Sequence, residues 1–98
     1  MIVVSRTPNT ITVCGHANFA RHGKDIVCAA VSVLLQTLIE SITQLTDDEM
    51  SFEMSKGDSY MTIKNPSEKA QLLIDSFFIG VNGISAAYPR HVKVLTQP

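Results

Sequence analysis

Residues 25–45, DIVCAAVSVLLQTLIESITQL, decide the fold of this chain because they form its longest amphipathic segment. Apolar side chains recur there at intervals of three and four residues, which predicts a helix of about five turns with one buried face. Asp25 suits the N-cap, since its carboxylate can accept a backbone N–H of the first turn, and Thr46-Asp47-Asp48 ends the helix. The buried face is expected to comprise Val27, Val31, Leu34, Leu35, Leu38, Ile42 and Leu45.

Segments of alternating polar and apolar residues lie on both sides of this helix and predict two β-hairpins. Thr7-Pro8-Asn9 has the composition of the first turn, and Gly57-Asp58 has that of the second. The strands are expected at residues 1–6, 10–16, 50–56 and 59–64.

A second helix is predicted from Asn65-Pro66, with Asn65 as the cap, Pro66 at the first helical position and Glu68 at the third, to about Ala87. Gly80 and Gly83 inside it indicate a bend or a close approach of backbone. Its buried face is expected to comprise Ala70, Leu73, Ile74, Phe77, Val81 and Ile84, and a last strand at residues 91–96 follows. The order ββαββαβ predicts an α+β two-layer sandwich, with both helices on one face of a mixed sheet.

The composition indicates one globular domain, residues 1–98, with 45% hydrophobic and 17% charged residues. The formal net charge is −1 and the charges are scattered, so nothing indicates a surface for nucleic acid or an anionic membrane. No uninterrupted apolar run reaches the roughly 20 residues of a membrane span, and MIVVSR does not resemble a signal peptide. We therefore expect a cytoplasmic protein whose two cysteines are free thiols.

Cys28 and His16 are the candidates for chemistry. Counting from the Asp25 cap places Cys28 at N3, where unpaired backbone N–H groups favour a thiolate and could also stabilise an oxyanion. His16 ends the second strand, directly before the loop that leads to this helix, and could exchange a proton with Cys28. Gly15 would permit either close approach of a substrate or a sharp turn of the strand.

Other interpretations of these residues remain open. A cysteine in the first turn of an apolar helix is also typical of a small core residue. Cys14, His16, His22 and Cys28 could instead be four ligands of a zinc ion, and Cys14 should lie close to His16 if both share a strand face. His22 could equally be a solvated loop residue, and His91 has no partner that the sequence identifies. A non-catalytic adaptor domain is a further alternative.

Asp25 and Ser32 each have two roles open to them. Asp25 could act only as the cap, or it could also orient His16 or bind the preceding loop. Ser32 lies one turn after Cys28, where its hydroxyl could bond back to the Cys28 carbonyl or lie near a substrate.

Two separated sequence boxes resemble the ribosomal-processing cysteine protease (Prp) family. They are GHA at residues 15–17 and DIVCAAVS at residues 25–32, and Gly23 lies in the loop between them. The resemblance implies a Cys–His dyad, with Cys28 as nucleophile and His16 as general base and acid, that works without a cofactor or a metal. Helix-start N–H groups, including that of Cys28, would stabilise the oxyanion.

The resemblance also implies a substrate and a way of binding it. The substrate would be the precursor of a bacterial large-subunit ribosomal protein, the one numbered twenty-seven, from which a short N-terminal extension is removed after an aromatic residue during ribosome assembly. The enzyme would be a homodimer. The loop of residues 18–24, with Asn18, Phe19 and a hinge at Gly23, would close over the peptide as a lid.

Overall fold

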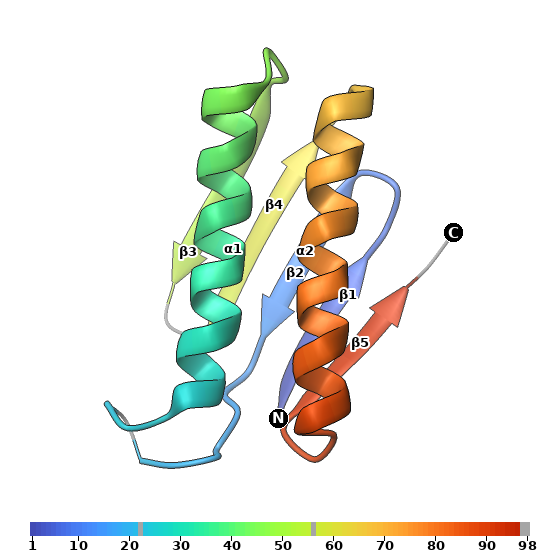
Figure 1. Ribbon diagram of the computed structural model, residues 1–98. Coiled ribbons are helices and arrows are strands. Elements are labelled where there is room, and N and C mark those ends of the chain that lie inside the picture. Colours follow the sequence, from blue (N-terminus) through green and yellow to red (C-terminus); the bar gives the residue numbers. More distant parts are fainter. Residues whose placement is uncertain (22, 56, 97–98) are drawn as a thin grey trace.

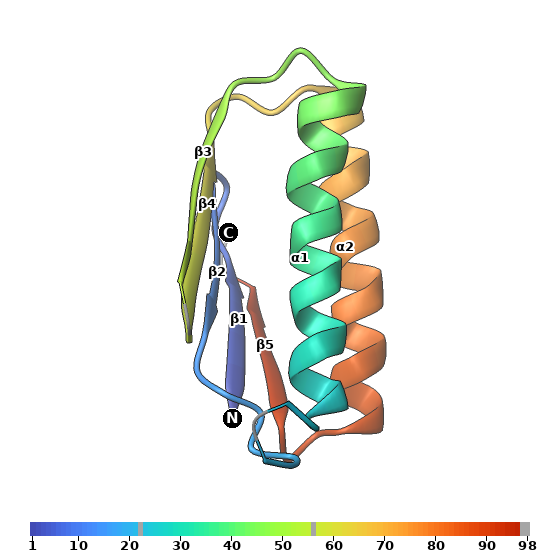
Figure 2. The same ribbon diagram turned by 90° about the vertical axis from the view of Figure 1, so that its left-hand side faces the viewer.

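The computed structural model describes residues 1–21, 23–55 and 57–96, which form five strands and two helices (Figure 1). Both helices cover the same face of the sheet, as Figure 2 shows. The predicted α+β two-layer sandwich in ββαββαβ order is therefore confirmed. The elements are β1 (Ile2–Arg6), β2 (Thr10–Cys14), α1 (Ile26–Leu45), β3 (Met50–Ser55), β4 (Asp58–Ile63), α2 (Glu68–Ala87) and β5 (Val92–Thr96).

The five strands form one mixed sheet in the order β3-β4-β2-β1-β5. The β1–β5 pair is parallel, and the other neighbours are antiparallel. Val4 of β1 lies opposite Val13 of β2 and Val94 of β5, and its side chain is fully buried beneath the helices. This arrangement brings the C-terminal end of β2, the start of α1 and the end of α2 to the same end of the molecule (Figure 1).

Helix α1 has the predicted N-cap and, apart from its last turn, the predicted buried face. Val27, Val31 and Ile42 are almost completely buried, and Leu34 is partly buried against the core. The expectation for Leu45 is wrong, because this side chain is 61% exposed. The helical periodicity continues the buried face from Ile42 to Thr46, four residues later. Leu45 therefore lies outside this face.

Helix α2 begins later than predicted. Its N-cap is Ser67, whose side chain accepts the N–H of Ala70, and not Asn65, which has a left-handed φ of 47°. The backbone N–H and the hydroxyl of Ser67 both donate to the carboxylate of Asp48 in the α1–β3 loop. This contact from a residue distant in sequence fixes Ser67 at the cap and leaves Pro66 before the helix.

The two helices approach each other closely at one of the two predicted glycines. A Cβ on Gly80 would lie 3.1 Å from Cδ1 of Leu34 on α1, whereas a Cβ on Gly83 would meet nothing within 4 Å. Gly80 therefore permits the contact between α1 and α2, and Gly83 does not.

Both helices are long and apolar enough to cross a membrane if only length and composition are considered. Core helices of soluble domains have the same two properties. Here the buried apolar side chains of each helix belong to the hydrophobic core.

Candidate active site

A sharp turn after β2 determines where His16 lies. The strand ends at Cys14, two residues earlier than predicted, because Gly15 adopts a φ of 93° and its N–H donates to the carbonyl of Gly57 at 2.7 Å. A Cβ on Gly15 would collide with the carbonyl oxygen of Met1. In this structure Gly15 therefore allows the chain to turn, which is one of its two predicted roles.

Cys14 and His16 were predicted to share a face of the strand, but they lie on different sides of the sheet. Val13 lines a cavity on the helix side of the sheet, so strand alternation directs Cys14 to the opposite side, where it is exposed and pairs in register with Asp58. A hydrogen bond to Asp58, partial burial and the charge of Asp58 raise the pKa of the Cys14 thiol. The turn at Gly15 breaks the alternation and places His16 beside the helix-side cavities instead.

The carboxylate of Asp25 joins the start of α1 to the preceding loop. Its Oδ1 accepts the N–H groups of Val27 and Cys28, both at 3.0 Å, and its Oδ2 accepts those of Phe19 and Ala20 at 3.0 and 3.3 Å. Asp25 is therefore both the predicted cap and a clamp on the loop. The N–H of Cys28 contributes most to lowering the pKa of this carboxyl, so acidification through that lowered pKa removes the clamp.

Cys28 lies at N3 of α1, as predicted, and its side chain is partly buried. Its Sγ accepts a hydrogen bond from the backbone N–H of Ala17 at 3.3 Å. The N–H of Cys28 itself is bound to Asp25. The expectation that this N–H is free to stabilise an oxyanion is therefore wrong for this conformation, and the N–H directed at the sulfur comes from the loop.

Two adjoining cavities bring the predicted residues together. His16, Cys28 and Ser32 line both of them. The first, of about 230 Å³, is also lined by residues of β1, β2, α1 and the β3–β4 hairpin, and the second, of about 530 Å³, by loop and helix residues. Ser32 is exposed at this surface, beside Cys28 and His16. The further lining residues are Ile2, Val13, Gly15, Val31, Ser55, Gly57, Asp58 and Ser59 in the first, and Asn18, Ala20, Gly23, Asp25 and Ala29 in the second.

The first half of the predicted lid is held against the end of α2. The ring of Phe19 makes edge-to-face contacts with Tyr88 and His91, at centroid distances of 5.2 and 5.4 Å. Nδ1 of His91 lies 2.8 Å from the carbonyl oxygen of Ala17. Phe19 lines neither cavity, in contrast to Asn18 and Gly23.

The β3–β4 hairpin contacts the ring of His16. A Cβ on Gly57 would lie only 2.9 Å from Nε2 of His16, and Gly57 has a φ of 86°. Gly57 was predicted only as a turn residue, and neither Ala17 nor His91 was predicted at the site. Ala17 lies within the GHA box. No local pattern in the sequence connects Gly57 or His91 to His16 or Cys28.

The zinc alternative gains no support from this geometry. His22, one of its four ligands, lies outside the described residues. Among the residues that the structure describes, no three His, Cys, Asp or Glu side chains form a group that could hold a metal ion. Cys14 projects from the other side of the sheet from Cys28.

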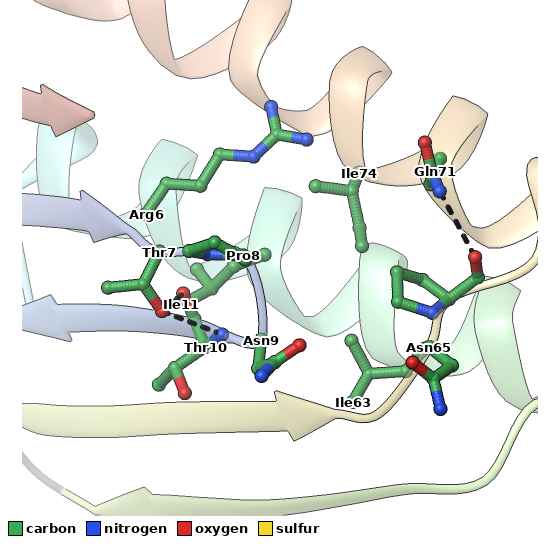
Figure 3. A pocket seen from close by; sticks show the side chains of 11 residues that line it. Arg6, Thr7, Pro8, Asn9, Thr10, Ile11, Ile63, Asn65, Gln71 and Ile74 are labelled. Carbon is green, nitrogen blue, oxygen red and sulfur yellow. Dashed lines mark hydrogen bonds between the residues drawn. The ribbon is translucent and has the colours of Figure 1, made fainter. Parts of the chain in front are cut away.

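A larger hollow, of about 550 Å³, lies at the opposite end of the sheet (Figure 3). It is formed by the β1–β2 turn, the end of β4 and the start of α2, and none of the described residues that line it is a cysteine or a histidine. Arg6, which lines this hollow, forms an ion pair with Asp75 at 2.9 Å and lies over the ring of Phe78. This hollow lacks the nucleophile and the base that the other two cavities share.

The fold and this pairing of a helix-start cysteine with a histidine define a candidate cysteine-dependent hydrolase. The chain belongs to the cysteine protease Prp family, whose model matches residues 2–93. It is 30% identical over 90 residues to the ribosomal processing cysteine protease Prp of Bacillus subtilis, covering 85% of this chain and 80% of that protein. It is 27% identical over 96 residues to the Mycoplasma genitalium protein of the same name, covering 96% and 94%.

Solved structures agree with this assignment. A Streptococcus mutans protein, SMU.848, is 30% identical and superposes with a TM-score of 0.78 over 98% of this chain and 93% of its own. The Staphylococcus aureus protease Prp in complex with a covalently linked product peptide has the same fold, with a TM-score of 0.92, 22% identity and coverage of 99% and 100%. The predicted family membership and the class of enzyme, a cysteine protease, are thereby confirmed.

Replacing Asp25 by Asn is expected to separate its two functions. An amide retains one acceptor oxygen for the helix cap, but its NH₂ group cannot accept the N–H groups of Phe19 and Ala20. Hydrogen exchange should therefore accelerate at Phe19 and Ala20 in Asp25→Asn, while Cys28 stays protected. Asp25→Ala should lose protection at all three amides. Equal protection of Phe19 and Ala20 in wild type and Asp25→Asn would contradict the clamp.

Replacing Gly57 by Ala is expected to displace the ring of His16. Gly23→Ala is the matched control, because Gly23 has the same φ of 86° but a Cβ there would meet nothing within 4 Å. Both variants should lose roughly 1–2 kcal/mol of unfolding free energy from the left-handed backbone. Only Gly57→Ala should shift the His16 ring resonances in an NMR spectrum. Unchanged His16 resonances in Gly57→Ala would show that the hairpin does not position this ring.

Proposed function

We propose that this chain is a cysteine endopeptidase in which Cys28 is the nucleophile and His16 is the general base and acid. The observation that carries the proposal is that both side chains line the same two adjoining cavities at the start of α1. Membership of the Prp family and the covalent product peptide named for the Staphylococcus aureus relative support it.

The reaction proceeds in two steps. The Cys28 thiolate attacks the scissile carbonyl and forms a C–S bond, while His16 holds the proton taken from the thiol. His16 then gives this proton to the leaving amine, the C–N bond breaks and a thioester remains. Water, deprotonated by His16, attacks the thioester, and Cys28 leaves with the proton restored. All protons and bonds balance without a cofactor.

The N–H of Ala17 is the donor best directed at the reacting atoms. Before attack it stabilises the negative charge on Sγ, from which it is 3.3 Å away. As the C–S bond forms, this charge passes to the carbonyl oxygen of the substrate, and the same N–H becomes available to it. Val27 and Cys28 cannot supply this donor while their N–H groups are bound to Asp25.

The two cavities suit an extended peptide that passes across the dyad. Val13 and Val31 give the first cavity an apolar wall, which fits the aromatic residue expected before the scissile bond. Asn18 and Gly23 line the second cavity, and open space surrounds Gly23. We assign the lid to residues 18–24, with Gly23 as its hinge and Phe19 docked on α2 as its anchored end.

The proposed substrate is the precursor of the large-subunit ribosomal protein numbered twenty-seven. The relatives are ribosomal processing cysteine proteases, which supports a substrate from the ribosome. We propose that the enzyme removes the short N-terminal extension of this precursor in the bacterial cytoplasm, and that it acts as a homodimer. Ser32, exposed beside the dyad, would contact the substrate.

Cleavage of a synthetic peptide that spans the extension and the mature N-terminus tests this proposal. Cys28→Ala should lower the rate by at least about 1,000-fold, because the nucleophile is removed. Cys14→Ala is the matched control and should cleave at the wild-type rate, since Cys14 lies on the other side of the sheet. Failure of the wild type to cleave, or equal cleavage by Cys28→Ala, would contradict the proposal.

A further inference from the structure

His91 lies 74 residues from Ala17 in sequence, but its ring contacts the Ala17 backbone directly. Its Nδ1 is 2.8 Å from the Ala17 carbonyl oxygen. A carbonyl oxygen can only accept a hydrogen bond, so Nδ1 must carry the proton in this contact. The contact therefore fixes both the position of Ala17 and the ring nitrogen that is protonated in His91.

Ala17 is restrained on three sides. Its carbonyl oxygen accepts from His91, the residue as a whole is buried with 1% exposure, and its N–H donates to Sγ of Cys28 at 3.3 Å. With the carbonyl and the side chain both held, the N–H of the same residue has little freedom to turn away from the sulfur.

The backbone of His91 is held by residues outside the loop that carries Ala17. Its backbone N–H donates to the carbonyl of Tyr88 at 2.9 Å, and its own carbonyl accepts the N–H of Ile2 at 2.9 Å. These bonds place His91 between the end of α2 and the start of β1. Its ring also meets the ring of Phe19 edge to face, which holds the next part of the loop.

We propose that His91 is a positioning residue for the proposed reaction: by donating from Nδ1 to the Ala17 carbonyl, it keeps the Ala17 N–H directed at the Cys28 sulfur. His91 does not touch the reacting atoms and acts only through Ala17. The inference rests on the proposed role of Cys28 as nucleophile. It makes the connection between α2 and β5, far from both sequence boxes, a part of the active site.

Two substitutions separate the hydrogen bond from the packing of the ring. His91→Phe keeps an aromatic ring against Phe19 but removes the donor. His91→Asn removes the ring but places an N–H donor the same number of bonds from Cα as Nδ1. Both are compared in a Cys14→Ala background, so that iodoacetamide labels Cys28 alone.

Removing the donor in His91→Phe should slow alkylation of Cys28 near neutral pH roughly tenfold. This factor corresponds to the low end of the free energy of a hydrogen bond to a charged group. The Ala17 amide should exchange faster in the same variant. His91→Asn should restore both values toward wild type. In peptide cleavage, His91→Phe should lower kcat more than it raises KM, by up to about 100-fold.

Two results would overturn the inference. One is wild-type alkylation and wild-type Ala17 exchange in His91→Phe. The other is equal impairment of His91→Phe and His91→Asn, which would show that the ring matters and the donor does not. Alkylation and exchange need no substrate, so they decide the role of His91 even if the wild type fails to cleave the peptide and the proposed function is wrong.

Discussion

The carboxylate of Asp25 is the contact on which the geometry of the site depends. One of its oxygens receives two N–H groups of the first turn of α1, and the other receives two N–H groups of the loop. An ordinary N-cap uses only the first pair. Because both pairs meet on one side chain, the helix that carries Cys28 and the loop that carries Ala17 cannot separate without breaking charge-assisted hydrogen bonds.

The same clamp determines which backbone N–H groups at the start of α1 are free to bind a substrate. The N–H groups of Val27 and Cys28 would be the natural donors for an oxyanion, but Asp25 already occupies them. The site therefore takes its donor from a loop residue, Ala17, whose carbonyl is bound by His91 in the connection between α2 and β5. The mechanism thus relies on contacts between segments far apart in the chain, and the amphipathic core supplies the rigid frame that maintains them.

Local signals in the sequence predicted most of the fold. The periodicity of α1, its Asp25 cap and the order of strands and helices follow from neighbours within about five residues, and all are present. The errors arise where distant residues intervene. Ser67 replaces Asn65 as the cap of α2 because Asp48 binds it, a contact across 19 residues that no local pattern could reveal.

The candidate site divides in the same way. Cys28 and His16 were predicted from local position and from the two boxes, and the turn at Gly15 brings them to shared cavities. Gly57 and His91 were not predicted at the site, because a hairpin contact and a contact across 74 residues depend on the completed sheet. His16 was assigned to the same strand face as Cys14 because the alternation was carried through Gly15, whose left-handed φ interrupts it.

The most direct test of the central claim, that Cys28 attacks the scissile carbonyl, is mass spectrometry of the enzyme quenched in acid during turnover of the extension peptide. We predict an adduct on Cys28 whose mass equals the N-terminal fragment joined as a thioester, with loss of the amine product. His16→Ala should form this adduct no faster than the wild type does. His16 serves the first step as well as the hydrolysis of the thioester, so its loss slows both. Cleavage of the peptide with no adduct on Cys28, or with the adduct on another residue, would contradict the account.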